Sequence, residues 1–124
     1  MLTAEAQDKV VAKVAAVLGT WEGESKCKVA ASACRDEHVI YEIVRDEKSV
    51  GGLRIDGYKV VAAEKQFMGP LQCKYEEKNK KLDCTAEIAR KNRWQFTVSG
   101  DVMTGTLVVD EGTLFREIRV TRKK

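Results

Sequence analysis

Histidine, proline and aromatic side chains are all scarce in this sequence of 124 residues. It contains one histidine, one proline, three tyrosines, three phenylalanines and two tryptophans. The lone His38 has no evident partner for acid–base or Cys–His catalysis. No glycine-rich phosphate loop, serine nucleophile elbow or zinc motif is present. We therefore expect a protein that is not an enzyme and that uses no cofactor.

Neither positive nor negative charge is in large excess. The chain has 22 basic and 19 acidic residues, a net charge of +3, and they are interspersed except for the basic end at 122–124. A nucleic-acid-binding protein needs a clustered basic face with stacking aromatics. The lysines are better explained as solvated surface, and no nucleic-acid partner is expected.

Long apolar runs are also missing. The longest candidate, 10–18, is interrupted by Lys13 and is shorter than the roughly 18 residues that a membrane span needs. The segment 1–19 has no basic start followed by an uninterrupted apolar stretch and a small-residue cleavage site. We expect no membrane span. If the protein is exported, we expect this chain to be the mature form with an added methionine.

Four cysteines are present, and their spacing favours disulfides over metal. Six residues separate Cys27 from Cys34 and ten separate Cys73 from Cys84, whereas zinc sites usually pair cysteines two to four residues apart. Two bridges, Cys27–Cys34 and Cys73–Cys84, are predicted, with no metal. Disulfides persist in oxidising compartments, so the predicted location is secreted or periplasmic.

The first part of the chain has helical periodicity. Between about 3 and 18, apolar residues fall on one helical face, Thr3 can cap the start, and Gly19 can end the helix. The residues of this face are Ala6, Val10, Val11, Val14, Val17 and Leu18. We predict one N-terminal amphipathic helix.

The rest of the chain alternates between apolar and polar residues, which is typical of strands with one wet face. Eight strands are predicted, at 21–29, about 38–45, 52–61, 65–76, 81–88, 92–99, from about 102 to 109, and 113–122. Their short connections predict antiparallel neighbours and an eight-stranded up-and-down β-barrel over about 20–122, in one domain covering 1–124. A β-sandwich is the alternative, but it requires long crossing connections that we do not find.

The sequence also predicts four details of strand geometry. Tyr58 and Val60 have the opposite parity to the preceding apolar residues, which indicates a bulge or tight turn at 56–57. A bend is expected at 69–70, because proline cannot sit in a regular central ladder. In the last strand, Leu114 is expected to face the core together with Ile118 and Val120. In the hairpin over 71–86, the two cysteines are equidistant from the turn and therefore face each other.

An early Gly19-Thr20-Trp21 leading into an eight-stranded meander, with an arginine near the end of the last strand, resembles lipocalin-like (calycin-type) barrels. The cysteine placement and the segments 19–24 and 103–109 look more like small bacterial secreted lipocalin-like proteins of unassigned function. The resemblance implies that Trp21 closes one end of the barrel and that an arginine packs across it. Antiparallel pairing of the first and last strands favours Arg122 for this structural role.

The inward parity of Arg116 at mid-strand makes it the candidate anchor for an anionic group of a ligand. Other inward residues that could line a cavity are Tyr41, Tyr58, Trp94, Phe96 and Met103. Small inward residues that could leave room are Gly23, Ser25, Ala86 and Gly105. In the alternative interpretation, Arg116 pairs with a glutamate or lies outside the barrel through a bulge, and these side chains only fill the core.

Asp36, Glu37 and His38 could offer two carboxylates and an imidazole to a metal, but only if they lie in a loop. A solvated loop is the simpler explanation.

Two functions remain open. The first is a non-enzymatic protein that holds a small apolar or amphipathic ligand in the barrel. The second is an extracytoplasmic interaction protein, such as a protease or lysozyme inhibitor, that uses the loops 28–37 and 46–52. A cavity above roughly 300 Å³ would favour the first.

Overall fold

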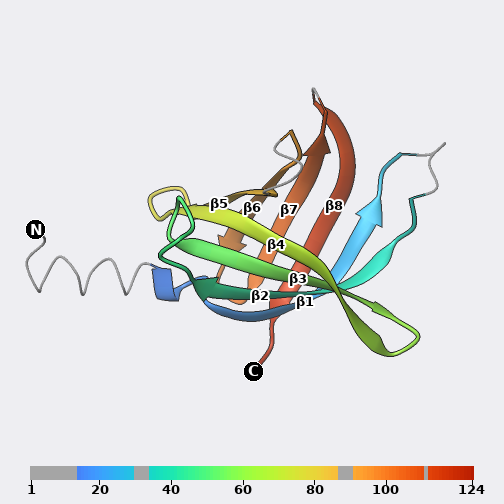
Figure 1. Ribbon diagram of the computed structural model, residues 1–124, viewed down its shortest axis with the longest axis horizontal. Coiled ribbons are helices and arrows are strands. Elements are labelled where there is room, and N and C mark those ends of the chain that lie inside the picture. The colour runs from blue at the N-terminus through green and yellow to red at the C-terminus, as the bar shows by residue number, and fades with distance from the viewer. Residues whose placement is uncertain (1–13, 30–33, 87–90, 111) are drawn as a thin grey trace, which may run out of the picture.

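The computed structural model describes residues 14–29, 34–86, 91–110 and 112–124. Eight strands form one closed barrel in which each strand is antiparallel to the next and β8 returns to pair with β1 (Figure 1). The strands are β1 (Gly19–Cys27), β2 (Glu37–Arg45), β3 (Leu53–Val61), β4 (Glu64–Glu76), β5 (Lys81–Ala86), β6 (Arg93–Ser99), β7 (Val102–Val109) and β8 (Thr113–Arg122). The predicted meander and its closure are confirmed.

The predicted N-terminal helix is not supported. Most of it falls on residues 1–13, which lie outside the described residues, and no helix is found in the described part. Val14–Val17 closes a single turn through a hydrogen bond from Val17 N to Val14 O at 3.0 Å. Val17 is nevertheless fully buried, and Val14 and Leu18 pack against the core, so this segment covers one end of the barrel. No helix of the described part is long and apolar enough to cross a membrane.

The barrel interior differs between its two ends. At the end where β1 starts and β8 finishes, here called the Trp21 end, large side chains fill the interior. They include Trp21, Ile43, Leu53, Leu82, Met103 and Val120, all essentially buried. At the other end, here called the Ser25 end, the inward positions of several strands carry small residues. The filled end supplies the hydrophobic core, and the Ser25 end has space.

Two irregularities in strand pairing change which residues face inward. The pairing of β3 with β4 jumps from Gly57↔Gly69 to Tyr58↔Phe67, so Met68 is an extra residue in β4. β3 itself pairs with β2 without interruption. The predicted bulge at 56–57 is therefore displaced to the neighbouring strand. Because β3 stays regular, Tyr58 faces outward, and its predicted place among the inward residues is wrong.

The second irregularity lies between β7 and β8. Pairing jumps from Leu107↔Arg116 to Val108↔Leu114, which makes Phe115 the extra residue. The jump turns Leu114 out of the core, where it is 38% exposed, contrary to the sequence prediction. Arg116, Ile118 and Val120 keep their inward parity. A bulge adds one residue to only one strand, so simple alternation along the sequence cannot locate it.

Both predicted disulfides are present. Cys73 and Cys84 are directly paired across β4 and β5, and both are buried in the core. Cys27 and Cys34 close the connection between β1 and β2 at the Ser25 end. In the chain-entropy picture, loops of this length give each bridge a stabilising contribution of about 2 to 3 kcal/mol.

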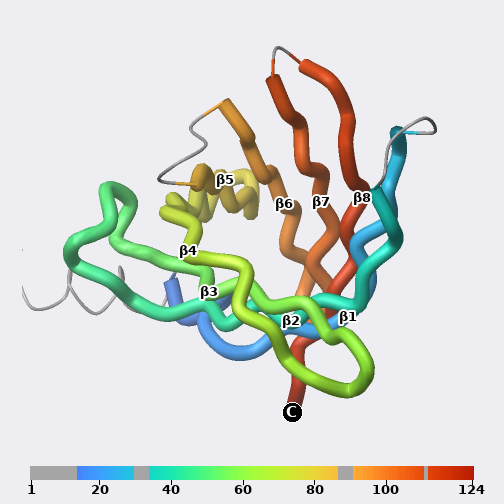
Figure 2. The backbone as a smooth tube through the Cα atoms, turned by 45° about the vertical axis from the view of Figure 1, so that its right-hand side comes forward, coloured from blue at the N-terminus to red at the C-terminus, as the bar shows by residue number. Residues whose placement is uncertain are grey.

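One hairpin extends beyond the rest of the barrel. In Figures 1 and 2, the β3–β4 hairpin projects past β1 and β2, while β6, β7 and β8 run side by side on another flank. Its turn is formed by Ala62 and Ala63, both with positive φ. Tyr58 and Phe67 stack on its outer face with ring centroids 5.3 Å apart.

Candidate functional site

A partly enclosed pocket of about 160 Å³ lies inside the barrel at the Ser25 end. Small inward residues make the space. The Trp21 end carries large inward side chains, whereas the inward residues here include Ser25, Gly57, Gly69 and Ala86. The remaining lining residues are Glu37, Tyr41, Met68, Pro70, Leu71, Trp94, Leu107 and Arg116. The pocket thus has an apolar wall and a group of four polar side chains.

The Arg116 guanidinium is the most connected of these polar groups. Its Nη2 lies 3.3 Å from Glu37 Oε1, and its Nη1 donates to Ser25 O at 3.1 Å and to Arg35 O at 3.0 Å. Nη1 also lies 3.4 Å from Ser25 Oγ. The side chain is only 12% exposed. Arg116 therefore pairs with a glutamate, as the alternative interpretation of the sequence proposed. Its charge does not require an anionic ligand as a partner.

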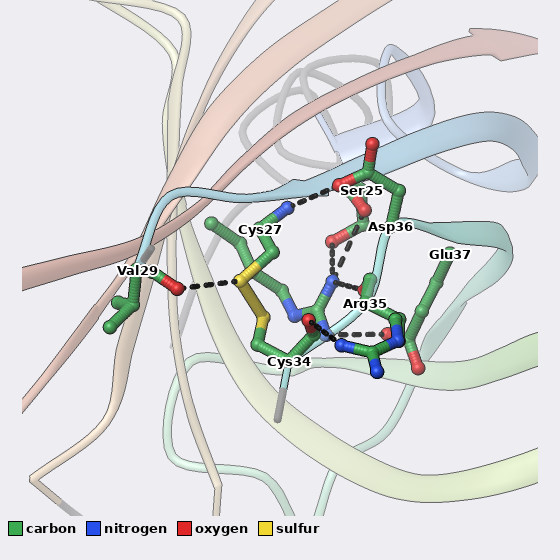
Figure 3. Close-up of a disulfide and its surroundings, with 8 residues drawn as sticks. Ser25, Cys27, Val29, Cys34, Arg35, Asp36 and Glu37 are labelled. Carbon is green, nitrogen blue, oxygen red and sulfur yellow. Dashed lines mark hydrogen bonds and ion pairs between the residues drawn. A yellow bond between two sulfur atoms is a disulfide. The ribbon is translucent and has the colours of Figure 1, made fainter. Parts of the chain in front are cut away.

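The Cys27–Cys34 disulfide holds the chain in place around this ion pair. Ser25, Asp36 and Glu37 lie beside the bridge in Figure 3. Asp36 Oδ1 accepts a hydrogen bond from Cys27 N at 2.8 Å, which ties the start of β2 to the end of β1. Fixing this junction fixes the carboxylate of Glu37, one residue further along.

The Tyr41 hydroxyl has no hydrogen-bond partner among the described residues, although the residue is only 4% exposed. Every fully buried polar side-chain atom in the described part has a partner. The hydroxyl must therefore retain accessible surface, and Tyr41 lines the pocket. Burial, and secondarily the negative charge of Glu37, raises the pKa of Tyr41 well above its usual range. The hydroxyl is a neutral donor facing the pocket.

Three of the six predicted lining residues meet at this pocket: Arg116, Tyr41 and Trp94. Phe96 and Met103 are core residues instead, and Phe96 packs edge-on against Tyr41 at 5.9 Å between ring centroids. Tyr58 lies outside the barrel. The three that meet share inward parity at the Ser25 end, whereas Met103 belongs to the filled Trp21 end.

Sequence reasoning missed Glu37 as a pocket residue. Its parity could have revealed it, because Glu37, Val39 and Tyr41 alternate along β2 and all face inward. The contribution of Met68 and Leu71 from β4 was also missed. The bend expected at 69–70 marked this part of β4, where the register shifts at Met68, but parity alone did not show which β4 side chains face the pocket.

The predicted small residues divide into two groups. Ser25 and Ala86 line the pocket, as expected. Gly23 and Gly105 serve a different purpose: a Cβ at Gly23 would stand 2.1 Å from Arg119 O, and one at Gly105 would stand 2.3 Å from Gln95 O. These two glycines permit close approach of backbone and do not make a cavity.

Asp36, Glu37 and His38 do not converge on one point. Glu37 faces the pocket, whereas His38 lies on the outer face, where its Nδ1 is 3.1 Å from Glu24 Oε1 and its Nε2 contacts Glu22 Oε2. These contacts, Glu22 first, raise the pKa of His38. Among the described residues, no group of three or more histidine, cysteine, aspartate or glutamate side chains is arranged to hold a metal ion.

At the opposite end, Arg122 lies over the fully buried Trp21, with its guanidinium carbon 4.4 Å from the ring centroid. The Trp21 indole donates to Val17 O at 3.0 Å, and Arg122 Nε donates to Asp101 Oδ1 at 3.1 Å. The guanidinium also contacts two backbone carbonyls of the segment before β1. The contact between Arg122 and a buried Trp21 that the family resemblance implied is therefore found.

A larger hollow of about 850 Å³ lies on the outside of the barrel, across β5 to β8 and β1. Its lining is mostly outward-facing and polar, and includes Thr97, Thr104, Thr106, Thr121, Gln95 and Arg119. Threonine is favoured on solvated strands, so this surface needs no ligand to explain it. We consider the smaller pocket the better candidate, because it is more enclosed and holds a hydroxyl without a partner.

No protein-family model, curated protein or solved structure matches the chain. A closed eight-stranded barrel occurs with many functions, so the fold alone assigns none. Function must therefore be inferred from the chemistry of the pocket at the Ser25 end.

Proposed function

We propose that this protein is a non-enzymatic binding protein that holds a small amphipathic molecule at the Ser25 end of its barrel. The observation that carries the proposal is the Tyr41 hydroxyl, nearly buried, without a partner among the described residues and facing a pocket with apolar walls. A bound ligand or a water would supply the missing partner.

The pocket volume limits the size of the ligand. At about 160 Å³ it falls below the roughly 300 Å³ that would by itself favour a ligand-holding barrel, so the volume excludes a drug-sized ligand and the proposal depends on the chemistry of the lining. An apolar cavity of about 150 Å³ is large enough for benzene. The proposed ligand is therefore a molecule of one ring or similar size, and the pocket does not enclose a long acyl chain.

Titration calorimetry with benzyl alcohol tests the proposal. Gly57→Val is the blocking variant, because a Cβ there meets its nearest atoms, which include Tyr41 Cδ1, only at 3.7 Å and the new side chain would occupy the pocket. Thr104→Val, on the outer face, is the matched control. We expect saturable binding by the wild type and the control, and none by folded Gly57→Val. Equal binding by all three proteins would place the ligand elsewhere.

Membership of the lipocalin-like barrels and export to an oxidising compartment are part of the same proposal. The Gly19-Thr20-Trp21 segment, the Arg122 contact with Trp21 and the closed barrel support the first. The two disulfides support a secreted or periplasmic location, because cytosolic thiols are kept reduced.

A second candidate function, binding of a partner protein through a loop, is favoured by one observation. In the loop 46–52, Val50 is 96% exposed, while Ser49 is buried and its Oγ donates to Leu53 O at 2.7 Å. Asp46 N donates to Gly52 O at 3.0 Å, which closes the loop. Loops held by a rigid scaffold commonly carry binding residues, and Val50 would be an apolar contact from this loop.

The two loops that the inhibitor hypothesis combined lie at opposite ends of the barrel. The loop 46–52 follows β2 at the Trp21 end, and the connection 28–36 precedes β2 at the Ser25 end. One flat partner surface cannot contact both. An assay of lysozyme and protease inhibition with wild type and Val50→Asp tests the loop alone. Inhibition that the substitution abolishes would support this second function, and no inhibition by the wild type would remove it.

A further inference from the structure

Resting on the proposed function, we propose that the ligand is electrically neutral and carries a hydroxyl group on an apolar ring. This differs from the anionic ligand that the position of Arg116 in the sequence suggested. The difference comes from three features of the pocket: the pairing of its charges, the single unpaired donor, and the composition of its wall.

The two charges that line the pocket, on Arg116 and Glu37, already pair with each other. Arg116 Nη2 is 3.3 Å from Glu37 Oε1, and Lys59 Nζ approaches Glu37 Oε2 at 4.0 Å from the rim. A carboxylate ligand near Arg116 would also lie near the Glu37 carboxylate, and an ammonium ligand near Glu37 would lie near Arg116. Each would meet a like charge in a partly desolvated site, which disfavours both.

The hydrogen-bonding groups that remain suit a hydroxyl. Tyr41 is a neutral donor that needs an acceptor atom, and no described residue supplies it. Glu37 is an acceptor whose Oε2 has, among the described residues, only the distant Lys59 contact. A ligand hydroxyl can accept from Tyr41 and donate to Glu37 at the same time. A ligand with a carbonyl oxygen alone would satisfy only the first of these groups.

The rest of the wall is apolar. Trp94, Leu107, Leu71 and Met68 converge from β6, β7 and β4 on the space next to the polar group. An aromatic indole, two branched aliphatic side chains and a polarizable thioether are suited to the faces and edges of a small ring. The pocket therefore has one polar corner for the hydroxyl and an apolar remainder for the ring.

A set of four size-matched compounds tests the inference: benzyl alcohol, toluene, benzoate and benzylammonium. Their dissociation constants for the wild-type protein are measured by calorimetry at neutral pH. We expect benzyl alcohol to bind about tenfold or more tightly than either ion, which corresponds to about 1.4 kcal/mol. Toluene lacks the hydroxyl, and we expect it to bind more weakly than benzyl alcohol.

Tyr41→Phe removes only the hydroxyl oxygen. We expect it to weaken benzyl alcohol binding by about fivefold, equivalent to one ordinary hydrogen bond, while toluene binding changes by less than about twofold. Toluene binding thus also reports whether the variant pocket is intact. Glu37→Gln, which removes one charge of the balanced pair, should improve benzoate relative to benzyl alcohol.

The outcomes separate this inference from the proposed function. If the wild type binds benzoate or benzylammonium most tightly, the inference that the ligand is neutral is wrong. The proposed small-molecule site at the Ser25 end would still stand. Equal effects of Tyr41→Phe on benzyl alcohol and toluene would overturn the role of the hydroxyl. If none of the four compounds binds to the wild type, the proposed function itself fails.

Discussion

Arg116 shows what the parity of a single residue can and cannot predict. Alternation along the last strand placed its side chain inside the barrel, and it lies there, 12% exposed. The partner was not predictable, because Glu37 comes from a strand that is not adjacent to β8 in the barrel. Only the closed barrel shows that the two side chains meet over β1, which pairs with both of their strands.

Removal of the Arg116 charge should destabilise the fold. We expect Arg116→Leu to lower the free energy of unfolding by about 1 to 3 kcal/mol, because Glu37 and two backbone carbonyls lose a charged donor. Urea unfolding measures the change. The double variant Arg116→Leu/Glu37→Leu should recover most of the loss, since it leaves no charge unpaired. A double variant no more stable than the single one would contradict this account of the pair.

Trp21 is the largest fully buried side chain of the filled end. We expect Trp21→Ala to cost about 3 to 5 kcal/mol of unfolding free energy, as for other large-to-small core changes. Trp21→Phe keeps an aromatic face for Arg122 but loses the hydrogen bond to Val17, so its cost should be smaller. Chemical denaturation compares the two variants. A loss below about 1 kcal/mol for Trp21→Ala would show that the ring does not hold this end together.

At the scale of elements, the outer face of β1 and β2 contains a pH-dependent contact. Contacts with Glu22 and then Glu24 raise the pKa of His38 above 6.5, and hydrogen bonds from Lys123 and then His38 lower the pKa of Glu22 below 4.5. The His38 contribution is complete below its unfolded pKa and is lost as pH rises through the folded value. The Glu22 contribution is lost as pH falls through its own folded value.

The difference in stability between the wild type and His38→Gln should therefore be larger at about pH 5.5 than at about pH 9, with the wild type the more stable protein. Thermal unfolding of both proteins at the two pH values measures this difference. His38 is partly exposed, so the gain will be small. If the difference between the two proteins did not depend on pH, the contacts of His38 would contribute nothing to the pairing of β1 with β2.

Replacing a strand glycine by alanine should change stability by an amount that depends on the atoms next to that glycine. At Gly23 a new Cβ would stand 2.1 Å from a backbone oxygen of β8, whereas at Gly57 the nearest atoms are at 3.7 Å. We expect Gly23→Ala to destabilise by more than about 2 kcal/mol, because backbone must shift, and Gly57→Ala to change stability by less than about 1 kcal/mol. Circular dichroism melts distinguish them. Equal losses would mean that strand spacing at Gly23 is not limiting.

The strands were largely predictable because alternation, short connections and the symmetric cysteine hairpin all agree on one register. The errors in orientation come from the placement of bulges. Tyr58 faces outward because β3 is regular and the extra residue is Met68 in β4, beside the bend expected at 69–70. Leu114 faces outward because Phe115 is an extra residue in β8, and no glycine or proline next to Phe115 marks that bulge.

At the scale of the whole molecule, the barrel divides into a filled end and an end with space. The division follows from residue size: large inward side chains collect near Trp21, and small ones collect near Ser25. Barrel closure was predictable from the number of strands and the problem of open edges. The pocket was not, because its volume depends on how eight strands bring their inward residues to the same level.

The most direct test of the central claim is a crystal structure of the wild-type protein soaked with benzyl alcohol. We predict electron density for the ring among Trp94, Leu107 and Leu71, with the ligand oxygen about 2.6 to 3.2 Å from the Tyr41 hydroxyl. Arg116 and Glu37 should remain paired in the complex. A pocket filled by protein side chains, or a ligand bound only in the outer hollow across β5 to β8 and β1, would contradict the claim.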